Sequence, residues 1–445
     1  MSLYDKASLV QIPSGYKGGS PNGTLYSVLP ANGDGDFDHT RATSATRVNK
    51  DGLIESVASG VPRLDYPLID GVVQDCPALL LEPSRENKAK RSEQFDDSYW
   101  VKLNSSIEDN QIVSPDGNQT ADKYTHGGSN AVNYVYGNAG LVTSGNYYTF
   151  SVFVKKGTGN FVQLLFGSGA FGVMHQNFDI DNGVIGSSSG DATPFIEEYP
   201  NGWYRIGITD NCTTTQTAGT AFVSLAQSNT SSRLNPFTSS DDFYVWGAQV
   251  EEGSYATSYI PTTTSSVTRN ADECNGAGTS AEFNDSEGVL FAELKGLNET
   301  DSATGYITLN DGSTTTNAIF IQYRNTGELR LYNGGTSTPE LIYRDANADL
   351  TKNIKLAIKY GTTTGSYKVY INGFSQTIEG AFVATAMSGL SKLQFAYSNA
   401  TSNPFIGKTK QLMTFNEALT DSELEQVTSW TSFGEMAKGQ LYTIE

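Results

Sequence analysis

Cysteine and histidine are scarce in this chain of 445 residues, which contains three of each. Cys76, Cys212 and Cys274 lie far apart and form no Cys-x-x-Cys pair, so their spacing indicates neither a zinc site nor a disulfide framework. The histidines are equally scattered along the sequence: His39, His126 and His175. A histidine-based catalytic triad or zinc site therefore has little material here.

Basic residues are also few. Only 17% of the residues are charged, and 29 Lys and Arg stand against 48 Asp and Glu, a formal net charge of −19. Binding to a phosphate backbone needs clusters of Lys and Arg, so we expect no nucleic-acid partner. The chain has no apolar run of about 18 residues, and residues 1–10 lack a basic region followed by an apolar stretch. We therefore expect neither membrane insertion nor a signal peptide.

The arrangements that hydrolases use are missing as well. No Gly-x-Ser-x-Gly elbow occurs, and the side chains of the adjacent Glu251 and Glu252 would diverge on a strand. Asp421, Glu423 and Glu425 fit a solvated helix face. We predict no catalytic residues, although an enzyme that brings distant carboxylates together in space is left open by sequence alone.

What the sequence does contain favours strands. Glycine (45), tyrosine (24) and phenylalanine (21) are abundant beside many Ser, Thr and Asn residues. Aromatic and β-branched residues between frequent turn formers are typical of β-structure. The length indicates two or three domains.

Alternating apolar residues predict a first β-sandwich over residues 94–262. Tyr148, Phe150, Val152 and Val154 share one face of a strand, while the residues between them point the other way. The run 203–209 alternates in the same manner. Asn-Gly at 182–183 signals a hairpin turn.

A second sandwich is predicted over residues 283–445, after an extended linker at 263–282. The inward residues of one of its strands are Ile354, Leu356, Ile358 and Tyr360. Hairpin signals occur at Asp311-Gly312, Asn325-Thr326-Gly327 and Asn372-Gly373. A short helix is expected at 420–428, where Thr420 can cap the helix and Glu423 follows three residues later.

Residues 1–93 form an arm without regular periodicity. Its polar stretch 38–66 cannot bury enough apolar surface to fold alone. We expect the arm to pack on another surface, either a downstream domain or a second subunit, and its deletion to leave the sandwiches folded. The apolar residues that would anchor it are Leu3, Leu9, Val10, Ile12, Leu25, Val28 and Leu29.

Several motifs resemble known families. The stretch 38–66, followed by PALLLEPSREN at 77–87, resembles the leader of bacteriophage virion proteins of the fibre and spike type. YTFSVFVK (148–155), NGWYRIGIT (201–209) and the segment 243–262 resemble jelly-roll carbohydrate-binding modules. That last segment runs into SVTRNAD (266–272), as it does in phage appendages. IKLAIKY, YKVYINGF and the closing segment 405–427 resemble a concanavalin A-like, laminin-G-like sandwich. The basic run KAKR after the leader departs from the usual apolar pattern.

These resemblances imply an all-β fold, with an irregular N-terminal docking arm followed by two antiparallel β-sandwich (jelly-roll) domains. They imply a head or tail fibre or spike on the virion surface, made in the host cytoplasm. Its partners would be further copies in a homotrimer, the capsid, portal or tail adaptor, and host-surface polysaccharide. The arginines expected to dock the arm are Arg41, Arg47 and Arg63.

Jelly-roll modules bind sugars by stacking exposed aromatic rings on pyranose rings. The candidate glycan-binding residues are Tyr134, Tyr136 and Trp203. No cofactor is expected; these folds often hold one structural calcium, for which Asp241 and Asp242 are the candidate ligands. Two alternatives are kept for the function: a tail-associated polysaccharide depolymerase and a purely structural capsid-decorating protein.

Overall fold

The structure is a computed structural model that describes most of the chain. The described residues are 2–13, 23–297, 305–312, 317–324, 328–333, 341–343, 351–362, 366–377, 387–397, 403–432 and 435. The hairpin signal expected at 325–327 lies outside them. No helix among these residues is both long and apolar enough to cross a membrane.

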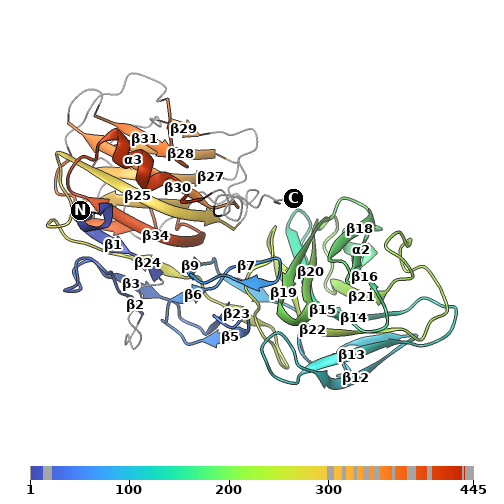
Figure 1. Cartoon of the computed structure of the whole chain (residues 1–445). Helices are drawn as coiled ribbons and strands as arrows, with labels where there is room; N and C mark the ends of the chain where they lie inside the picture. Colours follow the sequence, from blue (N-terminus) through green and yellow to red (C-terminus); the bar gives the residue numbers. More distant parts are fainter. Residues whose placement is uncertain are drawn as a thin grey trace.

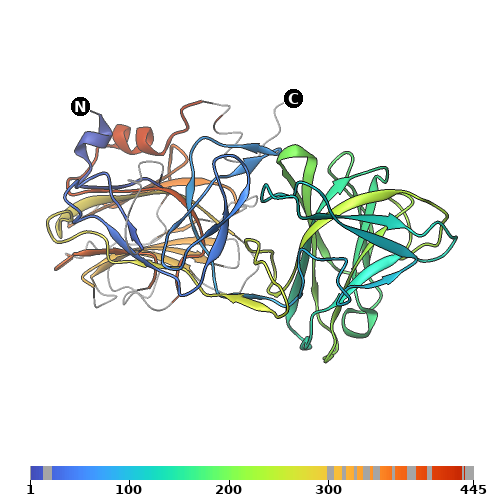
Figure 2. The ribbon, with the colours of Figure 1, turned by 90° about the horizontal axis from the view of Figure 1, so that it is seen from below.

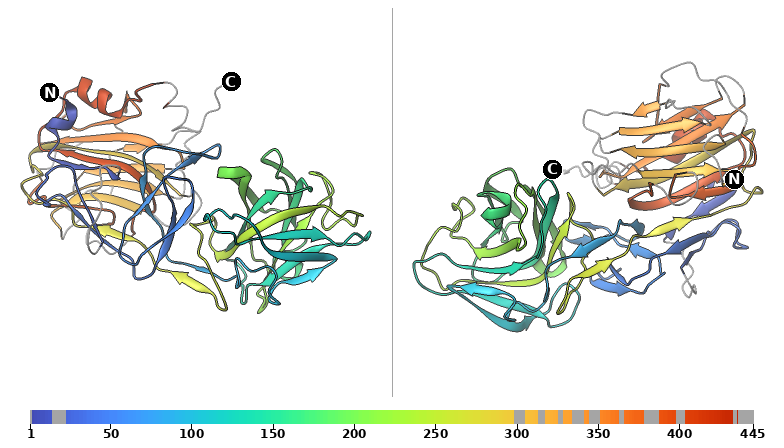
Figure 3. Two further views of the ribbon diagram at one scale, coloured as in Figure 1. Left: turned by 60° about the horizontal axis from the view of Figure 1, so that its bottom comes forward. Right: turned by 180° about the vertical axis from the view of Figure 1, so that it is seen from behind.

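The chain forms two β-sandwiches that are joined by its N-terminal arm, which confirms the all-β prediction (Figure 1). The arm lies against the C-terminal sandwich and extends from there to the middle sandwich, as the views from below and behind show (Figures 2 and 3).

The middle sandwich consists of two antiparallel sheets of six strands each. The first sheet runs β11 (Val101–Leu103), β14 (Tyr134–Asn138), β21 (Thr220–Leu225), β16 (Phe161–Phe166), β17 (His175–Asp179), β18 (Val184–Ser189). The second runs β12 (Ser105–Ile112), β13 (Ala121–His126), β22 (Asp242–Glu252), β15 (Tyr147–Lys156), β20 (Trp203–Asn211), β19 (Thr193–Tyr199). Two short helical segments lie in the connections: α2 (Ser168–Phe171) and the 3₁₀ turn η2 (Pro200–Gly202).

The second sheet of this sandwich is buried on both faces. Phe150, Val152 and Val154 of β15 lie in the core between the sheets, as their alternation predicts. The opposite face of the same sheet carries Phe153 and Trp246, which are also fully buried. The arm covers this outer face, since Ile54 packs in the same cluster. The apolar side chains on the outer face of this sheet therefore attach the arm to the middle sandwich.

The C-terminal sandwich also consists of two antiparallel sheets. One sheet runs β32 (Phe374–Ser375), β31 (Lys368–Ile371), β30 (Ile354–Gly361), β25 (Glu287–Gly296), β34 (Gly407–Phe415), β9 (Ala78–Leu81), β6 (Arg63–Asp65), with β1 (Leu9–Gln11) also paired to β34. The other runs β29 (Leu341–Tyr343), β28 (Glu328–Asn333), β27 (Ala318–Arg324), β26 (Gly305–Asn310), β33 (Lys392–Gln394). Three strands of the first sheet thus come from the arm.

Local signals placed several elements of this sandwich correctly. The helix α3 (Asp421–Thr428) begins after Thr420, whose hydroxyl accepts from the backbone of Glu423 in a capping box. Asn372 and Gly373 form the two-residue turn between β31 and β32, both with positive φ. In the middle sandwich, the predicted turn at Asn182-Gly183 connects β17 to β18.

Apart from β1, β6 and β9, the arm is made of short segments whose strands pair with one another or with the linker. Its remaining elements are α1 (Leu3–Lys6), β2 (Thr24–Leu25), β3 (Phe37–Thr40), β4 (Ala45–Val48), β5 (Ile54–Val57), β7 (Leu68–Ile69), β8 (Val72–Val73) and β10 (Arg85–Asn87). The linker is extended, as predicted, and its strands β23 (Val267–Arg269) and β24 (Glu273–Asn275) pair with β10 and β3.

Apolar residues of the arm lie inside the C-terminal core. Leu9, Leu25 and Phe37 share one buried cluster with the inward residues of β25 and β30. Val10 lies in a second cluster with Phe291 and Leu424. This confirms that the arm packs on downstream domains, one of the two surfaces expected for it.

The structure gives a physical reason against the expectation that the sandwiches stay folded without the arm. Strand β34 has β25 on one side. On its other side it pairs with β1 along residues 412–414 and with β9 along residues 407–409. Removing residues 1–90 would leave that edge unpaired and expose the apolar residues beneath it. The arm is a structural part of the C-terminal sandwich.

We predict that Leu81→Ala, a substitution in the arm, destabilises the C-terminal sandwich. Leu81 is 1% exposed and lies in its core, so truncation should cost about 2–5 kcal/mol of unfolding free energy. Hydrogen exchange should accelerate in β25 and β34 more than in β15. Val72→Ala, at a 62% exposed position of the arm, is the control and should change stability by about 0.5 kcal/mol or less. Unchanged exchange in β34 would contradict this assignment.

Candidate functional site

Three aromatic rings form a cluster on the outer face of the first sheet of the middle sandwich. Tyr134 and Tyr136 lie on β14, and Phe222 lies on the adjacent strand β21. The ring of Phe222 is stacked on that of Tyr136, with centroids 4.8 Å apart, and meets Tyr134 edge-on at 5.3 Å. All three side chains are partly exposed. We call these three residues the aromatic cluster.

Strand alternation explains why the cluster faces outward. Val135 of β14 and Val223 of β21 are cross-strand partners and are buried in the core. The residues on either side of them must then point away from the core. On the edge strand β11, the partners of the two tyrosines are Val101 and Leu103, which are 44% and 42% exposed. The aromatic cluster therefore continues into an exposed apolar strip.

A loop at 226–237 covers the neighbouring part of the same face. The backbone of Leu234 donates to the side-chain oxygen of Gln163 on β16, at 2.7 Å. The amide of Asn177 on β17 donates to the carbonyl of Ser231 at 2.7 Å. These bonds hold the loop over the outward polar residues of β16 and β17. The uncovered part of the face is the part that carries the aromatic cluster.

Trp203, the third predicted glycan contact, is placed elsewhere, and that prediction is wrong. Its side chain is 2% exposed and packs with Ile54, Phe153 and Trp246. A ring in this position cannot stack on a sugar, because the arm already covers it. Trp203 stabilises the contact between the arm and the middle sandwich.

The two candidate calcium ligands do not converge on one site. Asp241 accepts a hydrogen bond from the hydroxyl of Ser239 at 2.7 Å. Asp242 accepts from the backbone of Thr158 at 3.0 Å, and its other oxygen lies 3.5 Å from the ammonium of Lys123. An ammonium at that distance would repel a cation. Within the described ranges, no three His, Cys, Asp or Glu side chains gather as a metal site.

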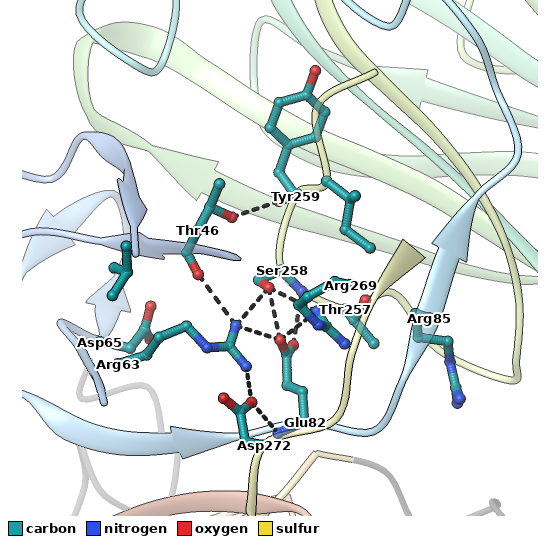
Figure 4. A network of polar contacts seen from close by, with 12 residues as sticks. Thr46, Arg63, Asp65, Glu82, Arg85, Thr257, Ser258, Tyr259, Arg269 and Asp272 are labelled. Atoms are coloured by element: carbon teal, nitrogen blue, oxygen red, sulfur yellow. Dashed lines mark hydrogen bonds and ion pairs between the residues drawn. The ribbon is translucent and has the colours of Figure 1, made fainter. Parts of the chain in front are cut away.

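Arg41 and Arg63, two of the predicted docking residues, are buried inside the protein, so they cannot contact a partner. The guanidinium of Arg63 donates to the carboxylates of Glu82, at 2.6 Å, and Asp272 (Figure 4). Arg41 donates to Asp272 at 2.9 Å. Both side chains have no exposed surface. The docking prediction is therefore wrong for these two arginines.

Glu82 and Asp272 are the acceptors at the centre of this buried network. Glu82 also accepts from Arg269, at 2.6 Å, and from both the hydroxyl and the backbone of Ser258. The backbone N–H of Glu82 donates to Asp272 at 2.9 Å. The network thus joins the arm, the end of the middle domain and the linker. We call these residues, together with Arg41 and Arg63, the buried ion network.

The charges of the network shift the pKa of its acids. Burial acts to raise the pKa of Glu82, but Arg269 and Arg63 outweigh it and lower the pKa to about 2. Burial also acts to raise the pKa of Asp272, and Arg63 and His39 again lower it. Both acids are therefore ionised in the folded protein at neutral pH.

Arg47 is the one predicted docking residue that lies near the surface. Its side chain is 25% exposed, and its Nε donates to Glu55 at 2.6 Å across the β4–β5 hairpin. It is thus already engaged within the arm.

Two motifs of the sequence contain the charged residues of the network. Arg269 and Asp272 belong to the motif SVTRNAD, and Glu82 precedes Pro83 in the leader motif. These motifs were interpreted as marks of a family rather than as partners. Their charged residues lie about 190 positions apart in sequence, so only the fold shows that they meet.

Comparisons with known proteins give distant similarity only. No family model matches the sequence, and no curated protein matches it. Among solved structures, the CBM40 of the Ruminococcus gnavus IT-sialidase has 17% identity, covering 35% of this chain and 94% of its own, with a TM-score of 0.27. A Trypanosoma rangeli sialidase has 11% identity, covering 73% of this chain and 53% of its own, also with a TM-score of 0.27.

A leech intramolecular trans-sialidase is similar over 36% of this chain and 27% of its own length, with 16% identity and a TM-score of 0.27. The chain therefore spans about half of the Trypanosoma rangeli sialidase and about a quarter of the leech trans-sialidase. What they share with it is a distant likeness of β-rich fold.

We predict that Glu82→Gln weakens the acid sensitivity of the protein. A lowered pKa means that Glu82 stabilises the fold above its unfolded value of 4.5, and that this contribution is lost as the pH falls toward about 2. The unfolding free energy of the wild type, measured with urea, should thus fall steeply between pH 4.5 and about 2. The unfolding free energy of the variant should fall less over this pH range. It should start about 3–5 kcal/mol lower, because Arg63 and Arg269 lose the carboxylate of Glu82.

The control for this substitution is Glu55→Gln, which removes a partly exposed partner of Arg47. It should follow the wild-type pH profile and differ by about 1 kcal/mol or less. If Glu82→Gln showed the same acid slope as the wild type, the network would not contribute to acid stability.

Proposed function

We propose that this protein is a glycan-binding appendage of a phage virion, and that it binds through the aromatic cluster. The observation that carries the glycan-binding part is the group of three partly exposed rings, Tyr134, Tyr136 and Phe222, on an uncovered sheet face. Aromatic rings in such a position offer an apolar surface on which the C–H face of a pyranose can stack.

The surroundings of the cluster support a shallow carbohydrate contact. Val101 and Leu103 extend its apolar surface, and Asn138 at the end of β14 is exposed beside it. The loop at 226–237, which covers the neighbouring part of this sheet face, contains serine, threonine and asparagine residues that can hydrogen-bond sugar hydroxyls. Contacts of this kind are weak singly, and repeated copies on a particle would multiply them.

The virion part of the proposal rests on the leader and linker motifs. The segments that resemble phage appendage proteins supply the buried ion network, so in this chain they join the arm to the linker and to the end of the middle domain. We propose that the arm, with its charged core enclosed, docks on the capsid, portal or tail adaptor through its outer surface in a homotrimer. The protein would lie on the virion surface after synthesis in the host cytoplasm.

We further propose that the protein acts by binding and not by catalysis. The alternative is a depolymerase, which would release new reducing ends from host-surface polysaccharide. The purified protein should release none above background in a reducing-sugar assay, while it retains polysaccharide in a pull-down. Release of reducing ends that rises with protein concentration would show that the depolymerase alternative is right.

We predict that the double variant Tyr134→Ala/Tyr136→Ala loses glycan binding but keeps its fold. Loss of two stacking rings should weaken binding on a glycan array at least tenfold, which corresponds to about 1.4 kcal/mol of binding free energy. Stability should change little, because both rings are partly exposed and lie outside the core. The unfolding free energy should change by about 1 kcal/mol per ring or less.

Two matched variants complete this test. Phe374→Ala removes a 73% exposed ring from the C-terminal sandwich and should leave both binding and stability unchanged. Trp203→Ala should instead cost about 3–5 kcal/mol of stability, as expected for a buried ring. Wild-type glycan binding by the double variant would show that the aromatic cluster is not the site.

A further inference from the structure

A cavity of about 520 Å³ lies where the arm and both sandwiches meet. The arm contributes Asp65 and Tyr66, the middle sandwich contributes Glu197 and Tyr204, and the C-terminal sandwich contributes two lysines. The cavity is separate from the aromatic cluster, which lies on the opposite sheet of the middle sandwich. Its volume is within the range of sites that bind small molecules.

The burial of the lining residues shows that the cavity opens to solvent. Its floor includes Asp65, Tyr199 and Arg205, which are almost fully buried. Its rim includes Asp70 and Glu197, which are exposed. A small molecule could thus enter from the surface and reach buried polar groups.

The two lysines, Lys295 on β25 and Lys408 on β34, are cross-strand partners. Lys408 is neutralised by Asp65, whose carboxylate lies 2.6 Å from its ammonium. Lys295 makes no hydrogen bond or ion pair with any described residue within the usual distances. Like charges opposite each other on neighbouring strands are destabilising. The arrangement therefore leaves one partly buried ammonium without a hydrogen-bonded or ion-paired partner among the described residues.

The surroundings of Lys295 disfavour its unpaired positive charge. Burial and then the charge of Lys408 lower the pKa of the Lys295 ammonium to about 8. Glu197 and Asp65 act in the opposite direction, but each acts less strongly than Lys408. An anion bound beside the ammonium would relieve the repulsion between the two lysines.

Further polar groups of the lining suit a ligand with hydroxyls. The carboxylate of Glu197 at the rim has no hydrogen bond or ion pair with the described residues and can accept. The rings of Tyr66 and Tyr204 add apolar surface. Acceptors, donors and rings in one small cavity are typical of saccharide sites.

We propose that this cavity binds a carboxylate-bearing sugar unit of an acidic saccharide, with its carboxylate on the ammonium of Lys295 and its hydroxyls on the carboxylate of Glu197. The site is a second one, and it does not depend on the aromatic cluster. Because the arm and both sandwiches supply its residues, it exists only in the assembled chain. A ligand there would contact all three parts at once.

Isothermal titration with glucuronate tests the proposal on the full chain. The wild type should bind glucuronate, and Lys295→Met should bind it at least tenfold more weakly, since methionine keeps the length of the side chain but removes its charge. Lys392→Met, at an exposed position of the other sheet of the C-terminal sandwich, is the matched control and should bind as the wild type does. The Tyr134→Ala/Tyr136→Ala variant should also bind glucuronate normally, so failure at one site can be distinguished from failure at the other.

Two further ligands separate the parts of the proposal. Glucose lacks the carboxylate and acetate lacks the hydroxyls, so both should bind at least tenfold more weakly than glucuronate. Equal binding of glucose would overturn the role of the carboxylate, and equal binding of acetate would overturn the assignment to a saccharide. Undetectable glucuronate binding by the wild type, or wild-type binding by Lys295→Met, would overturn the site itself.

A measurement on the unmodified protein guards against a variant that misfolds. Acylation with a small amine-reactive reagent at pH 8, mapped by mass spectrometry, should modify Lys295, because part of its amine is uncharged at this pH. Glucuronate should protect Lys295 at least tenfold while leaving Lys392 unprotected. Equal labelling of Lys295 with and without glucuronate would contradict the proposal.

Discussion

The buried ion network holds the arm, the linker and the end of the middle domain together. Glu82 comes from the arm, Asp272 and Arg269 come from the linker, and Ser258 comes from the end of the middle domain. A buried charge is tolerated only while its partners remain in place, since separation would leave it uncompensated in a medium of low polarity. The arm, the linker and the middle domain therefore cannot move apart one at a time.

Apolar contacts of the arm complement this polar constraint. On one side, β1 and β9 extend the C-terminal sheet beside β34 and insert leucines into its core. On the other side, the β4–β5 hairpin covers the outer face of the second sheet of the middle sandwich, where Trp203 lies. The aromatic cluster, on the opposite sheet of the middle sandwich, stays partly exposed. The arm also creates the cavity around Lys295, where three separate segments meet.

Short-range patterns in the sequence were sufficient for much of the fold. Alternation assigned Phe150 and Val152 to the core, and the capping box at Thr420 located α3, because both signals depend on residues a few positions apart. The sequence also showed that the arm lacks a core of its own, since its polar stretch has too little apolar surface. Tyr134 and Tyr136, which the sequence offered only as candidate glycan contacts, lie on the outward face of β14.

The sequence by itself determined which residues share a face of a strand, but only the tertiary structure decided what covers each face. Trp203 and Tyr134 looked alike in sequence, and a distant segment of the chain buries one and leaves the other partly exposed. Arg63 looked like a surface arginine until Glu82 and Asp272 were found on either side of it. Burial and pairing of this kind arise from contacts between residues far apart in the chain, and local spacing carries no information about them.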